Sequence, residues 1–441
     1  MKNWPQRVVE RVVEACAGRS VWVAYSGGVD SHVLLHLLAT SGQFSTGQLH
    51  AIHIDHGLSE QSGDWAEHCR QVSADVAANY HCIKVTVEGI SEQGLEAAAR
   101  QARYTAIADQ VSSQDFVLTA QHQDDQAETL LLQLLRGAGP KGLAAMPVQS
   151  QIADAQLLRP LLGITQAQII AYAEQYHLEW IEDPSNQDTQ LNRNYLRHQV
   201  WPVVKKRWPQ VSEVLSRSSQ HCADYDALAN DLGLLDLEAI SADEAIQQLS
   251  VSALMMLSLP RQRNVIRTAL QQWGMPLPSQ QILQALINEV CLADHDRMPV
   301  LSWDEVEVRR FQDSLYFDVP LVEWDDTVVY ECVGPTPVTL VDDRVVDWLE
   351  TDKLGISRDQ FEQGLRLSFR QGGESIQLAG HAHHKSLKHL YQEWMVPPWE
   401  RDRIPLLFVG DELVAVVGYG FSESCVLATG KQGYLPLIKL V

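Results

Sequence analysis

Short apolar runs alternate with longer amphipathic segments over the first 140 residues. Four of the runs predict strands, at residues 20–25, 49–54, 83–87 and 116–120. In the longer segments apolar residues recur three and four positions apart, which predicts helices at residues 31–39, 64–78, 95–111 and 124–136. Strands separated by helices of this length form parallel sheets through right-handed crossovers. The pattern therefore predicts an α/β fold with a doubly wound parallel sheet, whose ligands bind beyond the carboxyl ends of the strands.

The order of elements changes after Pro147. A helix is expected at residues 166–176 and a polar, Asn-rich loop at residues 182–196. Residues 224–259 carry seven acids and no Lys or Arg in a helical pattern, and residues 300–318 look like a pair of strands. These patterns divide the chain into a catalytic domain at 1–208, a mainly helical domain at 209–320, a connecting region at 321–355 and a small α+β domain at 356–441.

Composition narrows the class of protein. Of the 441 residues, 45% are hydrophobic, which is enough to bury sizeable cores. Lys and Arg number 34 and Asp and Glu number 56, so the formal net charge is −22. This charge argues against a protein that coats nucleic acid indiscriminately, because phosphates repel it. A selective nucleic-acid enzyme with this composition must concentrate its positive charge locally.

Cysteine usage and hydropathy indicate the cellular setting. The seven Cys residues are widely scattered and no Cys-x-x-Cys occurs, which argues against a disulfide framework, a zinc ribbon or a cysteine-held cluster. No stretch approaches 18 consecutive apolar residues, and the first ten residues lack the apolar core of a signal peptide. We therefore expect a cytoplasmic protein without a membrane partner.

The strongest chemical signal lies between the first predicted strand and the first predicted helix. A Gly pair there lets the backbone approach phosphate oxygens, and two Ser hydroxyls and the N–H groups of the helix start add donors for an anion. An Asp in the same loop could hold Mg²⁺ against the phosphates. The ordinary alternative is a βα turn with a Ser cap. The residues of this nucleotide-binding loop are Ser26, Gly27, Gly28, Val29, Asp30 and Ser31.

Three further polar segments lie at predicted strand ends or on adjoining helices. Residues 53–58 close the second strand, residues 96–104 lie on the third helix, and residues 119–129 run from the fourth strand into the fourth helix. Arg100 and Arg103 are one turn apart, so both guanidinium groups share one side of their helix. Each segment alone has an ordinary explanation, such as core histidines, a solvated Arg pair or an Asp cap. Their joint position beside a phosphate loop favours a catalytic site.

The loop lacks the Gly-Lys-Ser/Thr of a Walker A motif and resembles the pyrophosphate loop of the N-type ATP pyrophosphatases, the PP-loop superfamily. That resemblance implies cleavage of ATP between the α- and β-phosphates. With residues 180–186 and 192–198, and with residues 387–406 near the C-terminus, the chain resembles the tRNA(Ile)-lysidine synthases. The resemblance is specific over the first 200 residues and weak over 210–350. It departs at Gln121, where many members have a His, so a catalytic role of that His does not transfer here.

The resemblance implies a ligase that converts cytidine at the wobble position of an isoleucine tRNA with a CAU anticodon to lysidine. ATP would adenylate O2 of the cytosine, and the ε-amine of free L-lysine would then attack C2 and displace AMP. The phosphates require Mg²⁺ and cationic groups. The resemblance suggests Asp30 for Mg²⁺, and Arg100 and His122 for the α-phosphate.

The lysine nucleophile must lose a proton at neutral pH, because its ordinary pKa is about 10.4. A carboxylate beside it would accept this proton; Asp125 is the first candidate and Asp124 the second. Asp55 and Glu128 are weaker candidates for the metal or for the lysine ammonium. The partners implied are tRNA(Ile) and free L-lysine, with a homodimer as a possible assembly.

Positive charge is concentrated in one stretch of the chain. Residues 189–212 contain no acid, and Tyr195, Trp201 and Trp208 lie among the basic residues there. Phosphate contacts and stacking on an unpaired anticodon base are the expected use of such a stretch. The alternative is a basic helix that packs on an acidic neighbour. The candidate RNA-binding residues are Arg193, Arg197, Lys205, Lys206 and Arg207.

Three other functions compete with this one. A tRNA 2-thiolation enzyme of the same superfamily usually relies on a catalytic Cys pair or a Cys-x-x-Cys motif, which the sequence lacks. A small-molecule amidotransferase would carry a glutaminase domain, and neither an N-terminal Cys nor a nucleophile elbow is present. A plain RNA-binding module would not explain a phosphate loop with acids and cations beside it.

Overall fold

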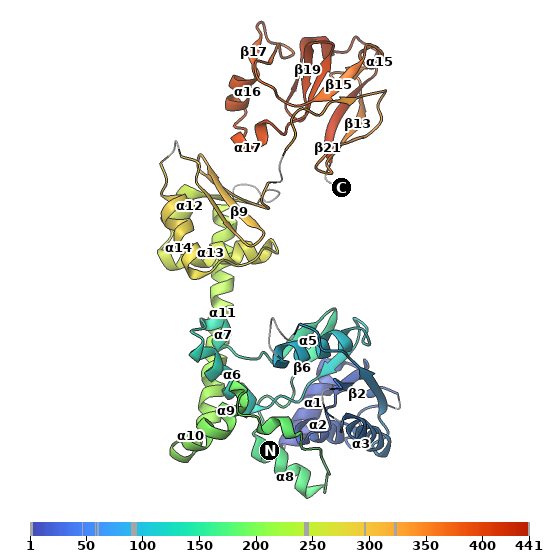
Figure 1. Cartoon of the computed structure of the whole chain (residues 1–441), viewed down its shortest axis with the longest axis vertical. Coiled ribbons are helices and arrows are strands. Elements are labelled where there is room, and N and C mark those ends of the chain that lie inside the picture. Colours follow the sequence, from blue (N-terminus) through green and yellow to red (C-terminus); the bar gives the residue numbers. More distant parts are fainter. Residues whose placement is uncertain are drawn as a thin grey trace. The chain divides into compact units, whose positions relative to one another are not determined.

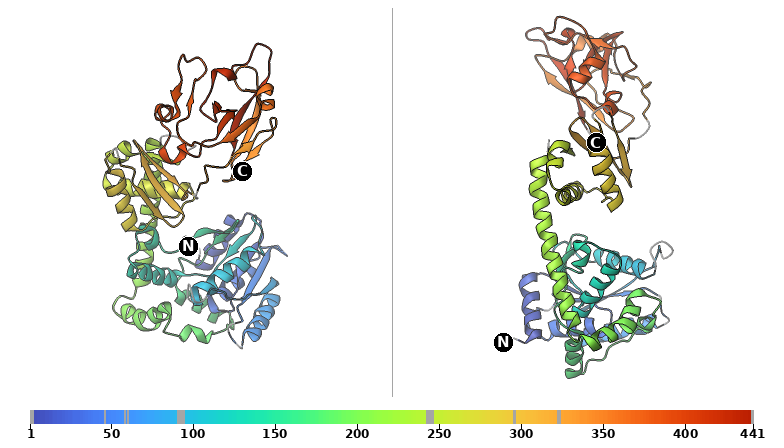
Figure 2. Two further views of the ribbon diagram at one scale, coloured as in Figure 1. Left: turned by 45° about the horizontal axis from the view of Figure 1, so that its top comes forward. Right: turned by 90° about the vertical axis from the view of Figure 1, so that its left-hand side faces the viewer.

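The computed structural model describes residues 3–45, 47–57, 59, 61–89, 95–241, 247–294, 297–321 and 324–439. The chain divides into two compact units, Met1–Leu235 and Asp236–Val441. Figure 1 colours the first unit from blue to green and the second from yellow-green to red, and Figure 2 shows the same ribbons from two other sides. Within the described ranges, no helix is long and apolar enough to cross a membrane.

The first unit is built on a six-stranded sheet in the order β3-β2-β1-β4-β6-β5. Neighbouring strands from β3 to β6 pair in parallel, and β5 joins β6 as an antiparallel hairpin. This arrangement confirms the predicted doubly wound parallel sheet. The strands are β1 (Val21–Ala24), β2 (Leu49–Asp55), β3 (Asn79–Lys84), β4 (Phe116–Leu118), β5 (Gln149–Ile152) and β6 (Ala155–Leu158).

Two details of this sheet differ from the prediction. The third strand was expected at residues 83–87, but β3 begins four residues earlier. β3 lies at the edge of the sheet, and its residues are exposed or half-buried, so it pairs with β2 without a continuous apolar run. The β5–β6 hairpin was not expected at all.

Helices cover both faces of this sheet (Figure 1). Val21 and Val23 of β1 lie in a core with residues of α1, α2, α3 and α8, whereas Trp22 between them packs with Ile107 of α5 on the other face. This alternation follows from the two-residue period of a strand. The helices around the sheet are α1 (Trp4–Cys16), α2 (Val29–Ala39), α3 (Ser62–Asp75), α5 (Leu95–Ala108), α6 (Gln123–Leu135), α7 (Pro140–Leu143) and α8 (Gln166–Gln175).

The segment after α8 contains more secondary structure than predicted. The expected loop at residues 182–196 includes a 3₁₀ turn and ends in a short helix that continues as a π-helical turn. Buried Leu196 and Trp201 pack with Ala127 of α6, so tertiary contacts stabilise helices that the polar pattern did not reveal. The elements are η1 (Pro184–Gln187), α9 (Asn192–Tyr195), η2 (Leu196–Val200), α10 (Trp201–Arg207) and α11 (Val211–Ile240), which runs into the second unit.

The second unit begins with helices that pack on a sheet of four antiparallel strands, in the order β7-β10-β9-β8. The predicted mainly helical domain therefore also contains a sheet, and the strand pair expected at residues 300–318 consists of three strands. The elements are β7 (Gln248–Ser250), α12 (Val251–Met256), α13 (Leu259–Gln272), α14 (Gln280–Ala285), η3 (Leu286–Cys291), β8 (Val300–Trp303), β9 (Val306–Phe311) and β10 (Ser314–Asp318).

The connecting region expected at residues 321–355 is wrong. Strands within it pair with strands of the C-terminal domain: β11 (Tyr330–Glu331) pairs with β15 (Leu365–Ser368), and β13 (Val345–Thr351) pairs with β21 (Gly433–Lys439) along its whole length. Acids and prolines gave the segment the composition of a linker, yet Val346 is fully buried. Its partner strand lies at the far end of the chain, where local pattern cannot indicate it.

The rest of the C-terminal domain has the α+β character that was predicted. Its strands form a five-stranded, a four-stranded and a two-stranded sheet. The remaining elements are β12 (Val338–Thr339), β14 (Ile356–Ser357), α15 (Arg358–Glu362), β16 (Ser375–Ile376), β17 (Lys385–Ser386), α16 (Leu387–Glu393), α17 (Pro398–Arg401), β18 (Leu406–Val409), β19 (Glu412–Val416), β20 (Gly420–Phe421) and η4 (Glu423–Cys425).

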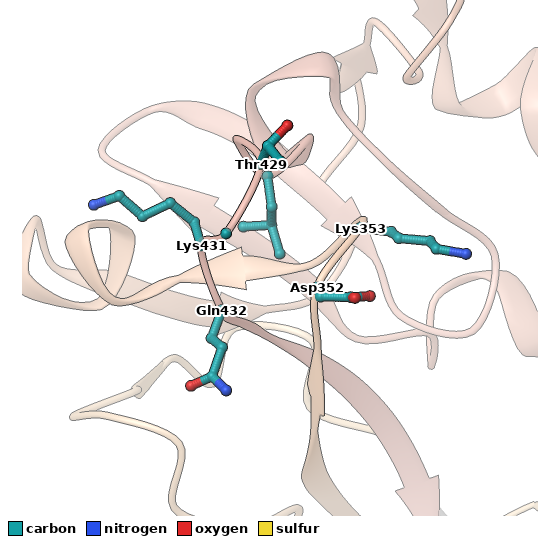
Figure 3. A pocket seen from close by; sticks show the side chains of 7 residues that line it. Asp352, Lys353, Thr429, Lys431 and Gln432 are labelled. Carbon is teal, nitrogen blue, oxygen red and sulfur yellow. The ribbon is translucent and has the colours of Figure 1, made fainter.

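A pocket of about 560 Å³ opens in this domain between the turn at Asp352 and Lys353 and residues 427–432. Lys353 and Lys431 line it, but Figure 3 shows their ammonium groups pointing away from each other. The pocket therefore does not concentrate positive charge. It belongs to the second unit, whereas the phosphate loop and residues 119–129 belong to the first.

Candidate active site

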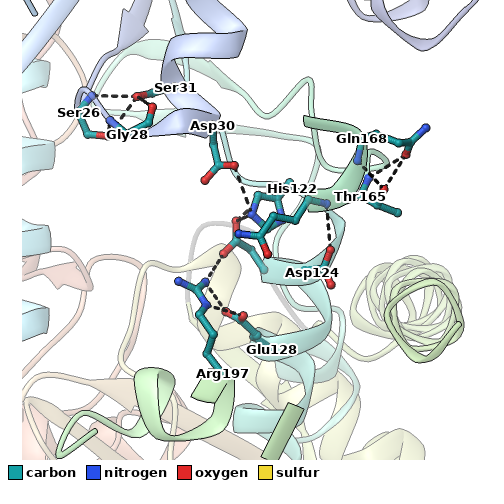
Figure 4. A network of polar contacts seen from close by, with 12 residues as sticks. Ser26, Gly28, Asp30, Ser31, His122, Asp124, Glu128, Thr165, Gln168 and Arg197 are labelled. Atoms are coloured by element: carbon teal, nitrogen blue, oxygen red, sulfur yellow. Dashed lines mark hydrogen bonds and ion pairs between the residues drawn. The ribbon is translucent and has the colours of Figure 1, made fainter. Parts of the chain in front are cut away.

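The nucleotide-binding loop joins β1 to α2 at the carboxyl edge of the sheet. Ser31 Oγ accepts the N–H of Ser26 at 3.2 Å and donates to the carbonyl of Gly28 at 3.0 Å. The hydroxyl of Ser26 accepts the N–H of Gly28 at 3.4 Å (Figure 4). These contacts brace the loop internally. Gly28 is the N-cap of α2 and has no side chain to cap the first turn, so the N–H groups there can bind an anion.

Gly27 is required by the geometry of this loop. Its φ of +85° lies in the left-handed region, and a Cβ atom would come within 2.5 Å of Ile181 Cδ1 and 3.0 Å of Cys69 Sγ. Ile181 also donates its N–H to the carbonyl of Gly27 at 3.0 Å. The segment after α8 therefore lies directly on the loop. At Gly28 an added Cβ would meet only Ser26 Oγ, at 3.5 Å.

Asp30 lies in the first turn of α2 and faces the start of α6. Its Oδ1 is 3.7 Å from Nε2 of His122 and is buried without a hydrogen-bond partner in the described part of the chain. Burial raises the pKa of this carboxyl, and His122 counteracts the effect in part. A buried carboxylate oxygen is costly unless a cation or a donor meets it. Asp30 thus has the properties expected of a metal ligand.

A metal ion at Asp30 would need ligands from outside the protein. Among the residues that the structure describes, no group of three or more His, Cys, Asp or Glu side chains could hold a metal. One carboxylate together with phosphate oxygens and water is a common environment of Mg²⁺ in nucleotide sites. Asp30 therefore fits Mg²⁺ that is held jointly with phosphates.

His122 and Asp125 meet Asp30 at the N-terminus of α6. His122 is only 2% exposed, and its Nε2 lies 3.4 Å from Oδ2 of Asp125. The same carboxylate oxygen accepts the backbone N–H of His122 at 3.0 Å. The structure thus brings three of the four predicted catalytic residues into one cluster (Figure 4).

Asp124, the second candidate base, points away from this cluster. Its Oδ1 accepts hydrogen bonds from Lys205 and, at 2.7 Å, from Ser212, and its Oδ2 accepts the N–H of Gln166 at 3.1 Å. Burial alone would raise the pKa of Asp124, but these donors outweigh it and lower the pKa to about 2. Asp124 is therefore an anchor between α6 and its neighbours, with both oxygens bonded inside the protein.

Arg193 and Arg197, two of the residues predicted to bind RNA, lie beside the other acids of α6. Arg193 donates from Nη2 to Asp125 Oδ1 and from Nε to Glu128 Oε2, both at 3.0 Å. Arg197 donates to the same Asp125 oxygen at 3.1 Å and to the two Glu128 oxygens at 2.9 and 2.8 Å. Arg193 and Arg197 are thus basic groups that pack on acidic neighbours, which was the alternative interpretation of the basic stretch.

The other predicted residues lie outside this cluster. Arg100 on α5 is exposed and donates to the hydroxyl of Tyr104 at 3.0 Å, and no contact of the described residues brings it to Asp30 or His122. Lys206 and Arg207 are exposed at the end of α10. The phosphate role of Arg100 and the RNA roles of Lys206 and Arg207 stay predictions.

The two weaker carboxylate candidates have structural partners. Asp55 is buried at the end of β2, where its Oδ1 accepts the N–H of Gly57 at 2.9 Å and closes a turn. Glu128 is 1% exposed, and both its oxygens accept N–H groups from arginines. A metal or a lysine ammonium at Glu128 would compete with these arginines for the carboxylate.

Sequence reasoning gave no functional role to two groups that follow β4, and noted Gln121 only as a departure from the family. Thr119 Oγ1 and Gln121 Oε1 are buried without a hydrogen-bond partner among the described residues, as is Nδ1 of the neighbouring His122. Buried polar atoms nearly always have partners, so these atoms are candidates to contact a ligand. The available signal was their place at the carboxyl end of a central parallel strand.

Comparison with known proteins agrees with this geometry. Three family models match: a PP-loop domain at residues 1–204, a TilS substrate binding domain at 249–316 and a TilS substrate C-terminal domain at 365–437. A tRNA(Ile)-lysidine synthase of Coxiella burnetii is 38% identical over 427 residues, 95% of this chain and 93% of that protein. Those of Alkalilimnicola ehrlichii and Pectobacterium atrosepticum are 40% and 38% identical, each over 93% of this chain and over 92% and 93% of their own lengths. The chain therefore belongs to the tRNA(Ile)-lysidine synthase family.

Proposed function

We propose that this chain ligates free L-lysine to C2 of the wobble cytidine in tRNA(Ile) with a CAU anticodon. The products are lysidine, AMP and pyrophosphate. The observation that carries the proposal is the convergence of the phosphate loop with Asp30, His122 and Asp125 at the carboxyl edge of the parallel sheet. The alternative of 2-thiolation is not favoured by the family to which the chain belongs.

In the first step, O2 of the cytosine attacks the α-phosphorus of ATP and the bond to pyrophosphate breaks. N–H groups at the start of α2 and the hydroxyl of Ser26 bind the phosphate oxygens, while Ser31 holds the loop in shape through its bond to the Gly28 carbonyl. Asp30 is the residue that would hold Mg²⁺, and the ion would supply charge neutralisation for the phosphates. His122, 3.7 Å from Asp30, is the group placed to bind the α-phosphate, and Arg100 would have to reach the phosphate from outside this cluster.

In the second step, the ε-amine of lysine attacks C2, the bond between C2 and O2 breaks, and AMP leaves with that oxygen. Before it attacks, the lysine ammonium must give up a proton. Asp125 accepts it in this proposal, since its Oδ2 faces His122 and Asp30 in the cluster. Asp124 is unsuited to the task, because a pKa of about 2 leaves it a weak proton acceptor.

The exposed end of the basic stretch is the part that we assign to RNA. Tyr195 and Trp208 are 54% and 61% exposed, and the guanidinium of Arg207 lies 5.9 Å from the centre of the Trp208 ring. Lys206 and Arg207 would contact phosphates, and the aromatic rings would stack on unpaired bases. A chain with a formal charge of −22 needs such a local positive surface to attract tRNA.

We extend the proposal to the location of the chain, which we expect to be the cytoplasm, and keep the homodimer as the one candidate assembly to be tested. Sedimentation of the full chain at micromolar concentration tests the assembly. A single species of monomer mass would contradict the homodimer without touching the proposed reaction.

The proposed reaction is tested by assaying the full chain with ATP, Mg²⁺ and a tRNA(Ile) transcript that carries a CAU anticodon. AMP and lysidine should form only when lysine is present, whereas adenylated RNA and pyrophosphate should form without it. A transcript with U in place of the wobble C serves as the matched control and should give neither product. AMP release that depends on a sulfur donor instead of lysine would favour the 2-thiolation alternative.

A further inference from the structure

Two carboxylates of α6, those of Asp125 and Glu128, face Arg193 and Arg197 and are hydrogen-bonded to them in different ways. Glu128 gives both oxygens to Arg193 and Arg197, and its side chain is 2% exposed, so it has no oxygen directed at a ligand. Asp125 gives only Oδ1 to the two arginines. Its Oδ2 faces the backbone N–H and the ring of His122, toward Asp30. One carboxylate is thus an anchor and the other is held with a single oxygen toward the site.

Helix geometry explains why these four side chains meet. Asp125 and Glu128 are three residues apart on α6, and Arg193 and Arg197 are four residues apart along α9 and η2, so each pair lies on one face of its helix. Buried Leu196, next to Arg197, packs with Ala127, which lies between the two acids. Packing of apolar residues therefore fixes the arginines opposite the carboxylates.

We propose that Arg193 and Arg197 are positioning residues for the second step of the reaction. With Glu128 they form a unit, here called the arginine clamp, that holds Oδ1 of Asp125 and aims Oδ2 at the reacting amine. The inference rests on the proposed function, because it assumes that Asp125 accepts the lysine proton. It assigns to the arginines a task other than binding tRNA phosphates.

The segment that carries the clamp also contacts the phosphate loop. Near its start, Ile181 donates its N–H to the carbonyl of Gly27, and its side chain lies where a Cβ of residue 27 would be. Near its end, Asn194 donates from Nδ2 to the carbonyls of Ser185 and Asp188, both at 3.0 Å, and so ties α9 to the turn before it. Residues 181–197 thus connect the ATP side of the site with the carboxylate of the second step.

Exposure separates the clamp from the rest of the basic stretch. The side chains of Arg193 and Arg197 are 27% and 31% exposed, and the hydrogen bonds and ion pairs that the structure gives them are with carboxylates. Lys206 and Arg207 are exposed. To form a bidentate contact with Arg193 or Arg197, an RNA phosphate would have to displace a carboxylate. Lys206 and Arg207 can meet a phosphate without such a change.

The test uses the full chain with a tRNA(Ile) transcript and two variants, Arg197→Lys and Glu128→Gln. Arg197→Lys keeps the charge and removes the planar fork that spans two carboxylates. Single-turnover lysine transfer at saturating tRNA and lysine should fall about ten- to a hundredfold, since small displacements of a reacting group have effects of this size. The tRNA affinity, the salt dependence of that affinity and lysine-independent pyrophosphate release should stay within about twofold of wild type.

A double-mutant cycle separates positioning from a general structural effect. If the clamp acts through Asp125, Arg197→Lys should slow transfer by less than about twofold in an Asp125→Asn background, because coupled groups are not additive. Equal effects in both backgrounds would overturn the proposal. The matched control is Arg70→Gln on α3, which removes an exposed Arg70–Glu67 pair away from the site and should leave all rates unchanged.

Three results would reject the clamp, and they have different meanings. A normal transfer rate in Arg197→Lys, with weaker tRNA binding, would show that the planar guanidinium of Arg197 contacts tRNA and does not position Asp125. Slow transfer in Asp125→Asn with normal transfer in both clamp variants would reject the clamp and keep the proposed function. Normal transfer in Asp125→Asn would reject the clamp together with the proton acceptor of the proposed function. If Glu128→Gln does not fold, Arg197→Lys alone carries the test.

Discussion

Asp124 and Asp125 are adjacent in the first turn of α6 and point to different sides of the helix, here called its outer and inner sides, where they have different partners. On the outer side, Asp124 is buried, both its oxygens are engaged and its pKa is lowered to about 2. On the inner side, Asp125 faces His122 and Asp30, and Oδ1 of Asp30 has no hydrogen-bond partner in the described part of the chain. Asp124 is bonded only to structural partners and stabilises the fold, whereas Asp125 lies beside Asp30, whose unpartnered Oδ1 is available to a ligand. Removing an acid should therefore affect activity on one side of α6 and stability on the other.

The largest expected effect is loss of ATP turnover in Asp30→Ala. Without this carboxylate the metal would lose its protein ligand, so pyrophosphate release in the presence of tRNA should fall below detection. Stability should not fall, because burial raises the pKa of Asp30 and its ionised form therefore costs the folded state free energy at neutral pH. Pyrophosphate release tests the loss of turnover, and thermal unfolding of the same preparation tests the unchanged stability. Turnover equal to wild type would exclude the metal role.

The next effect concerns Asp125→Asn, which keeps the shape of the side chain and removes its charge. Adenylated RNA should still form, while lysine transfer should slow by about a hundred- to ten-thousandfold, the usual cost of losing a positioned base. Single-turnover experiments with labelled ATP, with and without lysine, resolve the two steps. If the variant releases no pyrophosphate at all, Asp125 belongs to the metal and phosphate side of the site.

A smaller effect is expected from Gly27→Ala, with Gly28→Ala as its matched control. Ala at position 27 must adopt a φ of +85° and place its Cβ against Ile181 and Cys69, at a cost of roughly 1–2 kcal/mol. The affinity for ATP should therefore fall about tenfold. Gly28→Ala meets no close atom and should change the affinity by less than about threefold. Equilibrium binding of ATP to both variants makes the comparison, and equal losses would show that strain at Gly27 is not the cause.

Much of the inner side of α6 was predictable from sequence, because its signals are local. The phosphate loop and Asp30, His122 and Asp125 stand at the ends of predicted strands or the starts of helices, and a parallel sheet brings such positions together. The outer side was not predictable. Lys205 and Ser212, the partners of Asp124, lie far along the chain, and nothing in the local pattern marks them.

The same limit applies to two other segments of the chain. Arg193 and Arg197 looked like RNA-binding residues because the stretch around them contains no acid, yet the acids that they meet are on α6. Residues 321–355 looked like a connection because the strand that pairs with β13 lies near the C-terminus. Local periodicity identifies strands and helices, but it does not show which distant residue pairs with a charged side chain or which distant strand pairs with the edge of a sheet.

Asp124→Asn tests the outer side of α6 and should act on stability. With a pKa of about 2 in the folded chain and 3.8 as its ordinary value, the carboxylate contributes about 2 kcal/mol at neutral pH. A group with a depressed pKa loses this contribution as pH falls from about 4 toward 2. The variant should therefore unfold at a lower temperature than wild type at pH 6, and the difference should shrink at pH 3. A difference that is constant with pH would mean that packing, and not charge, is responsible.

The smallest expected effect concerns the exposed end of the basic stretch. The double variant Lys206→Gln with Arg207→Gln removes two exposed cations and leaves the hydrogen bonds of Arg193 and Arg197 to α6 intact. The affinity for tRNA should fall, and the slope of log affinity against log salt should decrease by about one unit for each phosphate that the variant no longer binds. Lysine transfer at saturating tRNA should keep its wild-type rate, which the arginine clamp variants should not. Binding titrations at several salt concentrations measure the slope. An unchanged slope would show that this end of α10 does not touch phosphate, and the RNA-binding surface would have to be sought outside the stretch at residues 189–212.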